Sequence, residues 1–179
     1  IATRYRLAWE AASASDIMAT ISLDCGDLDD GARWTTLLEY WTRKTDVRTF
    51  KTSLAVARTR LLLASHQPEE AIAVLGDVDY QPLSGPRPRQ ALTWLCAWCN
   101  AYTQLGNTAQ VELILPDLRA RLDEMLHRGR QDEYVRSYLG GLGALGRTKE
   151  RSDFARHYAI SRRDATQLPE DLREFSVES

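Results

Sequence analysis

The sequence has few cysteines, no long apolar run and no strong excess of either charge. Its three cysteines among 179 residues are too few for a disulfide scaffold and are typical of a reducing compartment. No stretch approaches the roughly 18 to 20 apolar residues that cross a bilayer. With a formal net charge of −2, no global field attracts nucleic acid or an anionic membrane. We therefore expect a cytoplasmic segment that binds neither.

Recognisable catalytic and cofactor motifs are also missing. The sequence contains no GxxxxGK[ST] phosphate loop, no HExxH and no GxSxG. Cys96 and Cys99 form a CxxC pair inside a predicted helix, whereas a reactive thiolate is stabilised at a helix N-terminus. A zinc site would need a second pair, but Cys25 is the only other cysteine and the histidines show no ligand spacing. We expect no catalytic residue, metal or cofactor, and small buried hydrophobes at Cys96 and Cys99. An all-helical enzyme is the least favoured alternative.

What the sequence does contain is a helical hairpin in residues 60–75, RLLLASHQPEEAIAVL. We expect one helix to end with the leucines that precede His66. Pro68 suits the first position of the next helix, where a fixed φ helps and a missing N–H costs nothing. Glu69 and Glu70 complement the helix dipole there. The pattern predicts two antiparallel helices joined by a tight turn.

The hairpin recurs every 40 residues. Counting from His66, the same offset leads to three glycines, Gly26, Gly106 and Gly146. Glycine readily ends a helix by adopting a positive φ. Four hairpins at one period indicate an α-solenoid, in which stacking buries the faces that single repeats leave open. We expect an all-α, right-handed α-solenoid of about four tetratricopeptide-like (TPR-like) repeats over residues 1–165, followed by an acidic tail or capping helix at 166–179. The alternative is four unrelated hairpins that share a spacing by chance.

Periodicity and breaker residues predict where the helices lie. Asp16 is a suitable N-cap, so a break is expected at Ser15–Asp16, and Pro116 should kink or restart its helix. Residues 78–88 hold three prolines and a glycine, and we interpret them as a long link between hairpins, not a domain boundary. Trp34, Leu37, Leu38 and Trp41 form an apolar stripe at helical spacing. The expected helical ranges are 2–25, 28–44, 47–65, 68–77, 89–105, 108–127, 131–145 and 149–165.

The hairpin period, the small turn residue and the Ala71 that follows His66 by five positions resemble tetratricopeptide-type repeats. The usual repeat is shorter, and its first-helix Tyr occurs only once, as Tyr102. More specifically, RLLLASHQPEEAIAVL resembles the helical repeats of MalT-type regulators, bacterial ATPase-linked transcription factors of the LuxR class. The resemblance implies a sensor arm that binds an inducer or a regulatory protein, without catalysis. The family's nucleotide loop and DNA-reading helix-turn-helix would lie outside this chain. Since IATRYRLAWEAA has neither an initiator Met nor a signal peptide, we expect a fragment.

Two further surface features have competing interpretations. Trp94, Trp98 and Tyr102 share one helix face, where they form either an exposed shelf for a ligand or, as we favour, packing between hairpins. Residues 119–163 hold eleven basic and six acidic side chains. Because the signs are interspersed, we interpret this segment as a solvated surface, not a nucleic-acid interface.

A ligand site is predicted from the repeat register. In tetratricopeptide-type proteins the residue six positions before the turn faces the concave groove, and here that position holds Thr20, Arg60, Asn100 and Gly140. Arg136 stands ten positions before its turn and Tyr102 follows Asn100 closely. The alternative is that these side chains are merely solvated. The predicted groove residues are Arg60, Asn100, Tyr102, Arg136 and Gly140, and their chemistry favours an acidic or polar ligand.

Two functions are consistent with the predicted repeats and groove. One is the ligand- or partner-sensing helical-repeat arm of a larger transcriptional regulator, which would bind a protein, a peptide or a small-molecule inducer. The other is a stand-alone TPR-like adaptor or chaperone that mediates protein–protein interactions. Homo-oligomerisation stays open in both.

Overall fold

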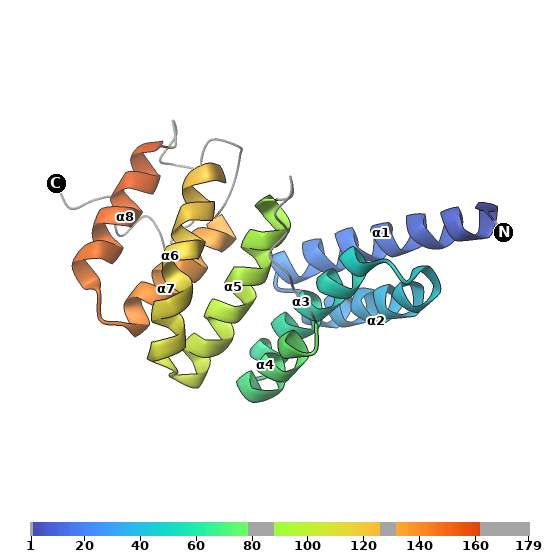
Figure 1. Ribbon diagram of the computed structural model, residues 1–179, viewed down its shortest axis with the longest axis horizontal. Coiled ribbons are helices and arrows are strands. Elements are labelled where there is room, and N and C mark those ends of the chain that lie inside the picture. Colours follow the sequence, from blue (N-terminus) through green and yellow to red (C-terminus); the bar gives the residue numbers. More distant parts are fainter. Residues whose placement is uncertain (1, 79–87, 126–131, 162–179) are drawn as a thin grey trace. The chain divides into compact units, whose positions relative to one another are not determined.

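The computed structural model describes residues 2–78, 88–125 and 132–161, and in these ranges every regular element is an α-helix (Figure 1). The expectation of an all-α fold is confirmed for this part of the chain. None of these helices combines the length and the apolar character that crossing a bilayer demands. The helices are α1 (Ala2–Asp24), α2 (Leu28–Thr45), α3 (Arg48–Ala64), α4 (Pro68–Gly76), α5 (Pro88–Leu105), α6 (Thr108–Met125), α7 (Asp132–Ala144) and α8 (Thr148–Ser161).

Contacts divide the chain into two compact units, Ile1–Pro82 and Leu83–Ser179. Unit 1 contains α1 to α4, and unit 2 contains α5 to α8. The division falls inside the stretch 78–88 that we interpreted as a link between hairpins of one domain. A single repeat domain over 1–165 therefore stays a prediction, and the expected tail at 166–179 lies outside the described residues.

All four predicted hairpin turns share one backbone geometry. Gly26, His66, Gly106 and Gly146 have φ values of 78°, 57°, 73° and 66°. In each turn this residue's amide donates to the carbonyl three residues earlier, and the following amide donates to the carbonyl five residues before it. This pair of bonds is the Schellman arrangement that closes a helix. The predicted turns, spaced 40 residues apart, are confirmed.

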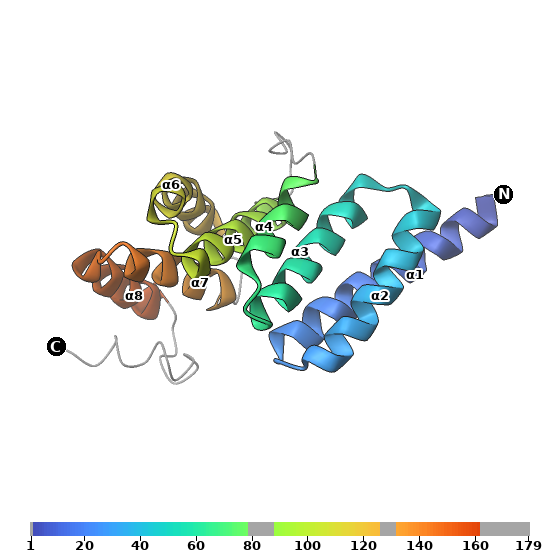
Figure 2. The same ribbon diagram turned by 90° about the horizontal axis from the view of Figure 1, so that it is seen from below.

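Small residues let α1 and α2 pack closely in unit 1. The buried face of α1 consists mostly of small residues: Ala8, Ala12, Ser15, Ala19 and Ser22, with Leu23 at its end. That of α2 consists of Gly31, Thr35, Leu38, Thr42 and Thr45. A Cβ on Gly31 would lie 2.7 Å from Leu23 Cδ2, so the two helices approach most closely near their shared turn. α3 lies beside both helices (Figure 2), and its Phe50 joins Ala12 and Leu38 in the core.

The helix break expected in unit 1 at Ser15–Asp16 is wrong. α1 runs unbroken through Ser15 and Asp16. Ser15 Oγ donates to Ala11 O at 2.8 Å within the helix, and the Asp16 carboxylate accepts a hydrogen bond from Ser53 Oγ of α3 at 3.0 Å instead of capping a new helix. The apolar stripe expected in α2 is also only partly buried, since Leu37 is 43% exposed. The face that packs is the one that carries small residues, because small side chains permit the close approach.

Unit 2 has a continuous core to which α5, α6, α7 and α8 all contribute. Gly141 of α7 lies at its tightest point, where an added Cβ would be 2.8 Å from Leu115 Cδ2 and 2.9 Å from Cys99 Sγ. A kink or a restart was expected at Pro116. The restart is wrong, because α6 continues from Thr108 to Met125 with Pro116 on its exposed face, and the kink stays a prediction. In unit 2, α5 and α7 are in direct contact, and most of the predicted site residues lie at this contact.

Candidate functional site

Polar side chains bridge α5 and α7 in unit 2. Asn100 Nδ2 donates to Ser137 Oγ at 3.1 Å, and Ser137 Oγ donates in turn to Glu133 O at 3.2 Å. A second bridge joins Thr93 Oγ1 and Tyr134 OH at 3.1 Å. Because a buried hydroxyl needs a partner, these bonds fix the register of the two helices. Asn100 is thus held in place rather than freely solvated.

Two predicted site residues flank this bridge on α7. Arg136 and Gly140 are four residues apart, so they share one face of the helix, next to Ser137. Both are exposed. A Cβ on Gly140 would meet nothing within 4 Å, so the surface of α7 is open at this position. The structure therefore brings Asn100, Arg136 and Gly140 together along what we call the α5–α7 seam.

Tyr102 does not belong to the α5–α7 seam. It follows Asn100 by two residues, which is a rotation of about 200° around the helix. Its ring stacks on Trp98 with the centroids 5.2 Å apart, and Trp94 continues the row with its centroid 6.5 Å from that of Trp98. Trp94 is only 3% exposed and the other two rings are half-buried, so this row packs and forms no exposed shelf.

Arg60 lies in unit 1, where it joins α3 to α1. Its guanidinium pairs with the Asp24 carboxylate at 2.8 Å, and the two side chains are 22% and 41% exposed. The repeat register predicted that Arg60 is a groove residue, and this stays a prediction. The ion pair shows in addition that removing Arg60 removes a contact between two helices.

We expect Arg60→Ala to lower the free energy of unfolding by about 0.5 to 1 kcal/mol, the upper range for exposed ion pairs, because this pair is partly sheltered. Urea unfolding of Arg60→Ala, Asp24→Ala and the double variant should give a coupling energy of similar size. The matched control is the more exposed Arg6–Glu10 pair, whose side chains are 81% and 49% exposed and whose coupling should be near zero. Additive effects at Arg60 and Asp24 would contradict the pairing.

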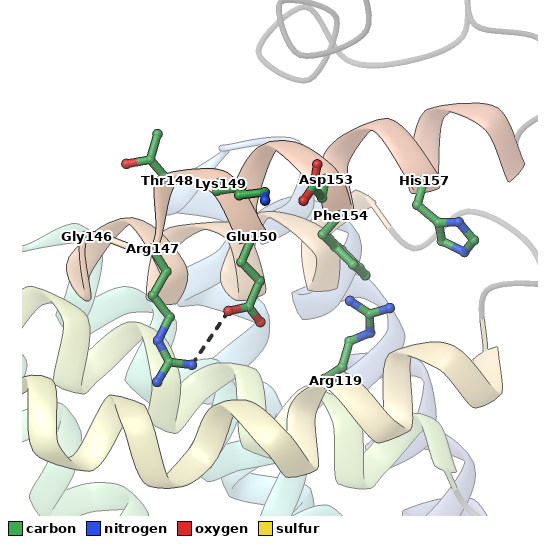
Figure 3. Close-up of a pocket in the computed structure, with 9 residues that line it drawn as sticks. All are labelled: Arg119, Gly146, Arg147, Thr148, Lys149, Glu150, Asp153, Phe154 and His157. Carbon is green, nitrogen blue, oxygen red and sulfur yellow. Dashed lines mark ion pairs between the residues drawn. The ribbon is translucent and has the colours of Figure 1, made fainter.

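An open hollow that the sequence analysis did not predict lies between α6 and α8 (Figure 3). It has a volume of about 710 Å³. Besides Arg119, eight residues of α8 and its preceding turn line it: Gly146, Arg147, Thr148, Lys149, Glu150, Asp153, Phe154 and His157. The Arg119 guanidinium lies 4.4 Å from the Phe154 ring centroid and pairs with Asp123 at 2.9 Å. Arg147 pairs with Glu112 and Glu150. Arg119 and Arg147 of this hollow are thus paired with carboxylates. The only feature of the sequence that pointed to this region was the mixed charge of residues 119–163.

Cys96 and Cys99 are buried, as the sequence analysis expected, with 3% and 0% exposure. Burial raises the pKa of the Cys99 thiol to about 11 and that of Cys96 well above its usual value. Both groups are therefore neutral thiols at physiological pH. In the described ranges no cluster of His, Cys, Asp and Glu side chains could hold a metal ion.

The α5–α7 seam offers an amide, a guanidinium and an open glycine position. These groups donate hydrogen bonds and positive charge, which suits a polar or acidic ligand. Among the side chains of this seam that the structure describes, none forms a pair of nucleophile and base. Comparisons of the chain with protein-family models, with curated proteins and with solved structures found no match.

Proposed function

We propose that this chain is a non-catalytic binding module: a right-handed, TPR-like α-solenoid that serves as the sensing arm of a larger transcriptional regulator. The proposal is carried by the recurrence of one helical hairpin, closed by a left-handed residue at 26, 66, 106 and 146. Hairpins that recur in this way stack into extended arrays whose concave surfaces bind partners. The resemblance of residues 60–75 to MalT-type repeats supports the regulatory setting.

The ligand that fits the α5–α7 seam best is acidic or polar: a small-molecule inducer or an acidic peptide segment. Arg136 supplies a positive charge, Asn100 a fixed amide, and Gly140 the space for close approach. Arg60 is the repeat equivalent of Asn100, one period earlier in the chain. A guanidinium that meets a carboxylate in partial shelter gives a strong, charge-assisted hydrogen bond.

We expect hexaglutamate or citrate, titrated by calorimetry at low salt, to bind the wild-type chain. Arg136→Ala should weaken the binding by more than about 1 kcal/mol, since charge-assisted hydrogen bonds contribute about 1.5 to 3. Its melting temperature should change little because Arg136 is exposed. Lys149→Ala, in the hollow between α6 and α8, is the control and should bind as the wild type does. Equal affinities of the wild type and Arg136→Ala would place the site elsewhere.

The regulatory setting is tested by the gene that encodes this segment. A long reading frame with a GxxxxGK[ST] loop upstream and a DNA-reading helix-turn-helix downstream is the expected result. A short reading frame that encodes little beyond these residues would contradict the regulator and favour the adaptor or chaperone.

A further inference from the structure

The Asn100 amide can face Ser137 in only one way without the loss of a hydrogen bond. Ser137 Oγ donates to Glu133 O at 3.2 Å. A hydroxyl has a single hydrogen, so toward Asn100 this oxygen can only accept. The Asn100 atom that lies 3.1 Å from it is therefore the donor Nδ2. If the amide turned over, Ser137 would have to give up Glu133 O in order to donate to Asn100 Oδ1.

This orientation leaves Asn100 Oδ1 as an open acceptor. None of the described residues donates a hydrogen bond to Oδ1, and it is not one of their buried polar atoms that lack a partner. The side chain as a whole is half-buried. Oδ1 is therefore accessible on the α5–α7 seam. The sequence analysis predicted Asn100 as a polar groove residue, but it could not tell which atom of the amide a ligand would meet.

The α5–α7 seam also carries a negative charge, which the sequence analysis did not include in the site. Glu133 precedes Arg136 by three residues and Ser137 by four, so it shares their face of α7. Burial is the main reason that the pKa of the Cys96 thiol is raised, and the nearby charge of Glu133 raises this pKa further. Because Cys96 lies one turn before Asn100 on α5, the Glu133 carboxylate belongs to the seam.

A ligand of this seam thus meets three different groups: the acceptor Asn100 Oδ1, the anion Glu133 and the cation Arg136. Both charged side chains also interact within the chain, so a ligand has to suit both charges at once. A purely acidic ligand would suit Arg136, but Glu133 would repel it and Oδ1 would receive no donor. A ligand with an ammonium group beside its carboxylate suits all three groups.

We propose that the α5–α7 seam selects an acidic zwitterion with the chemistry of an acidic α-amino acid. Its ammonium group donates to Asn100 Oδ1 and is attracted by Glu133, while a carboxylate meets Arg136. Ser137 is a positioning residue, because it holds the Asn100 amide with the oxygen toward the ligand. This inference rests on the proposed function, since it specifies the ligand of the same site.

Two ligands that differ only in the ammonium group test the selection by calorimetry at low salt. L-Glutamate and glutarate share their carbon chain and both carboxylates. The wild-type chain should bind L-glutamate about tenfold more tightly, the effect of one charge-assisted hydrogen bond. Equal affinities that both fall in Arg136→Ala would overturn the selection and leave the acidic site standing. Failure of both ligands to bind would also overturn it, and hexaglutamate then decides separately about the proposed function.

Ser137→Ala tests the positioning role. Without the hydroxyl the amide can turn over freely, so the preference for L-glutamate should fall to about threefold or less while the affinity for glutarate stays within about twofold. The matched control is Thr93→Val, which removes the other hydrogen bond between α5 and α7, to Tyr134, and should keep the full preference. Circular dichroism checks that both variants keep their helix content. An unchanged preference in Ser137→Ala, or an equal loss in both variants, would overturn the role of Ser137.

Asn100→Asp should change the preference in the opposite direction. An aspartate keeps an oxygen toward the ligand and adds a negative charge, which attracts the ammonium group and repels glutarate. The ratio of the two affinities should therefore exceed that of the wild type. A lower ratio would contradict the assignment of Oδ1 as the atom that meets the ligand.

Discussion

Replacing Gly141 with alanine is expected to destabilise unit 2 by about 1 to 2 kcal/mol, whereas the same change at the neighbouring Gly140 should stabilise it. A Cβ at position 141 would lie 2.8 Å from Leu115 Cδ2 and 2.9 Å from Cys99 Sγ, closer than side chains pack. Overpacking a core costs about 1 to 3 kcal/mol, and the higher helix propensity of alanine offsets at most about 1. At Gly140 no atom lies within 4 Å of the added Cβ, so the propensity gain acts alone.

Urea unfolding of the two variants measures this difference. The two midpoints should move in opposite directions with unchanged slopes, because the surface exposed on unfolding stays the same. Both glycines belong to the same turn of α7, so any effect of the backbone alone would be shared. Equal stabilisation by both changes would show that α7 does not approach α5 and α6 as closely as described.

The native protein is expected to react with iodoacetamide at Cys25 and to protect Cys96 and Cys99 by more than about 100-fold. Cys25 is exposed, whereas the other two thiols are buried in the helix core of unit 2. Burial raises the pKa of Cys99 to about 11. At about pH 8 only about a thousandth of this thiol would be the reactive thiolate, even if the reagent could reach it.

Mass spectrometry of the alkylated peptides, from native and from denatured protein, checks the protection. In denaturant all three cysteines should react fully, and in the native state only the Cys25 peptide should. Protection of Cys99 should weaken as the pH rises toward 11, because the thiolate fraction grows. Rapid native alkylation of Cys96 or Cys99 would contradict their burial and restore a redox interpretation of the CxxC pair.

The turns were predictable because their chemistry is local. All four have a positive φ, and three of them carry glycine, the residue that adopts it at no steric cost. His66 adopts φ 57° without being glycine, and the leucines before it and Pro68 after it identified it as a turn. The position of Pro68 at the start of α4 was likewise predicted from the sequence. Features that depend on one residue and its immediate neighbours were therefore predicted correctly.

The errors arose where a distant partner decides the role of a residue. Asp16 resembles an N-cap in sequence, but Ser53, 37 residues away, makes it a link between helices. Arg60 and Asn100 were identified as equivalent by counting, yet the count could not reveal Asp24 or Ser137 as their partners. The hollow beside Arg119 was missed for the same reason, since it depends on how α6 meets α8.

The central claim is that the α5–α7 seam binds an acidic or polar ligand through Arg136 and Asn100. A crystal structure of this protein with bound hexaglutamate tests it most directly. We predict a ligand carboxylate within hydrogen-bond distance of the Arg136 guanidinium, because a charge-assisted hydrogen bond there is strong. A ligand bound at another surface, or no bound ligand, would contradict this site.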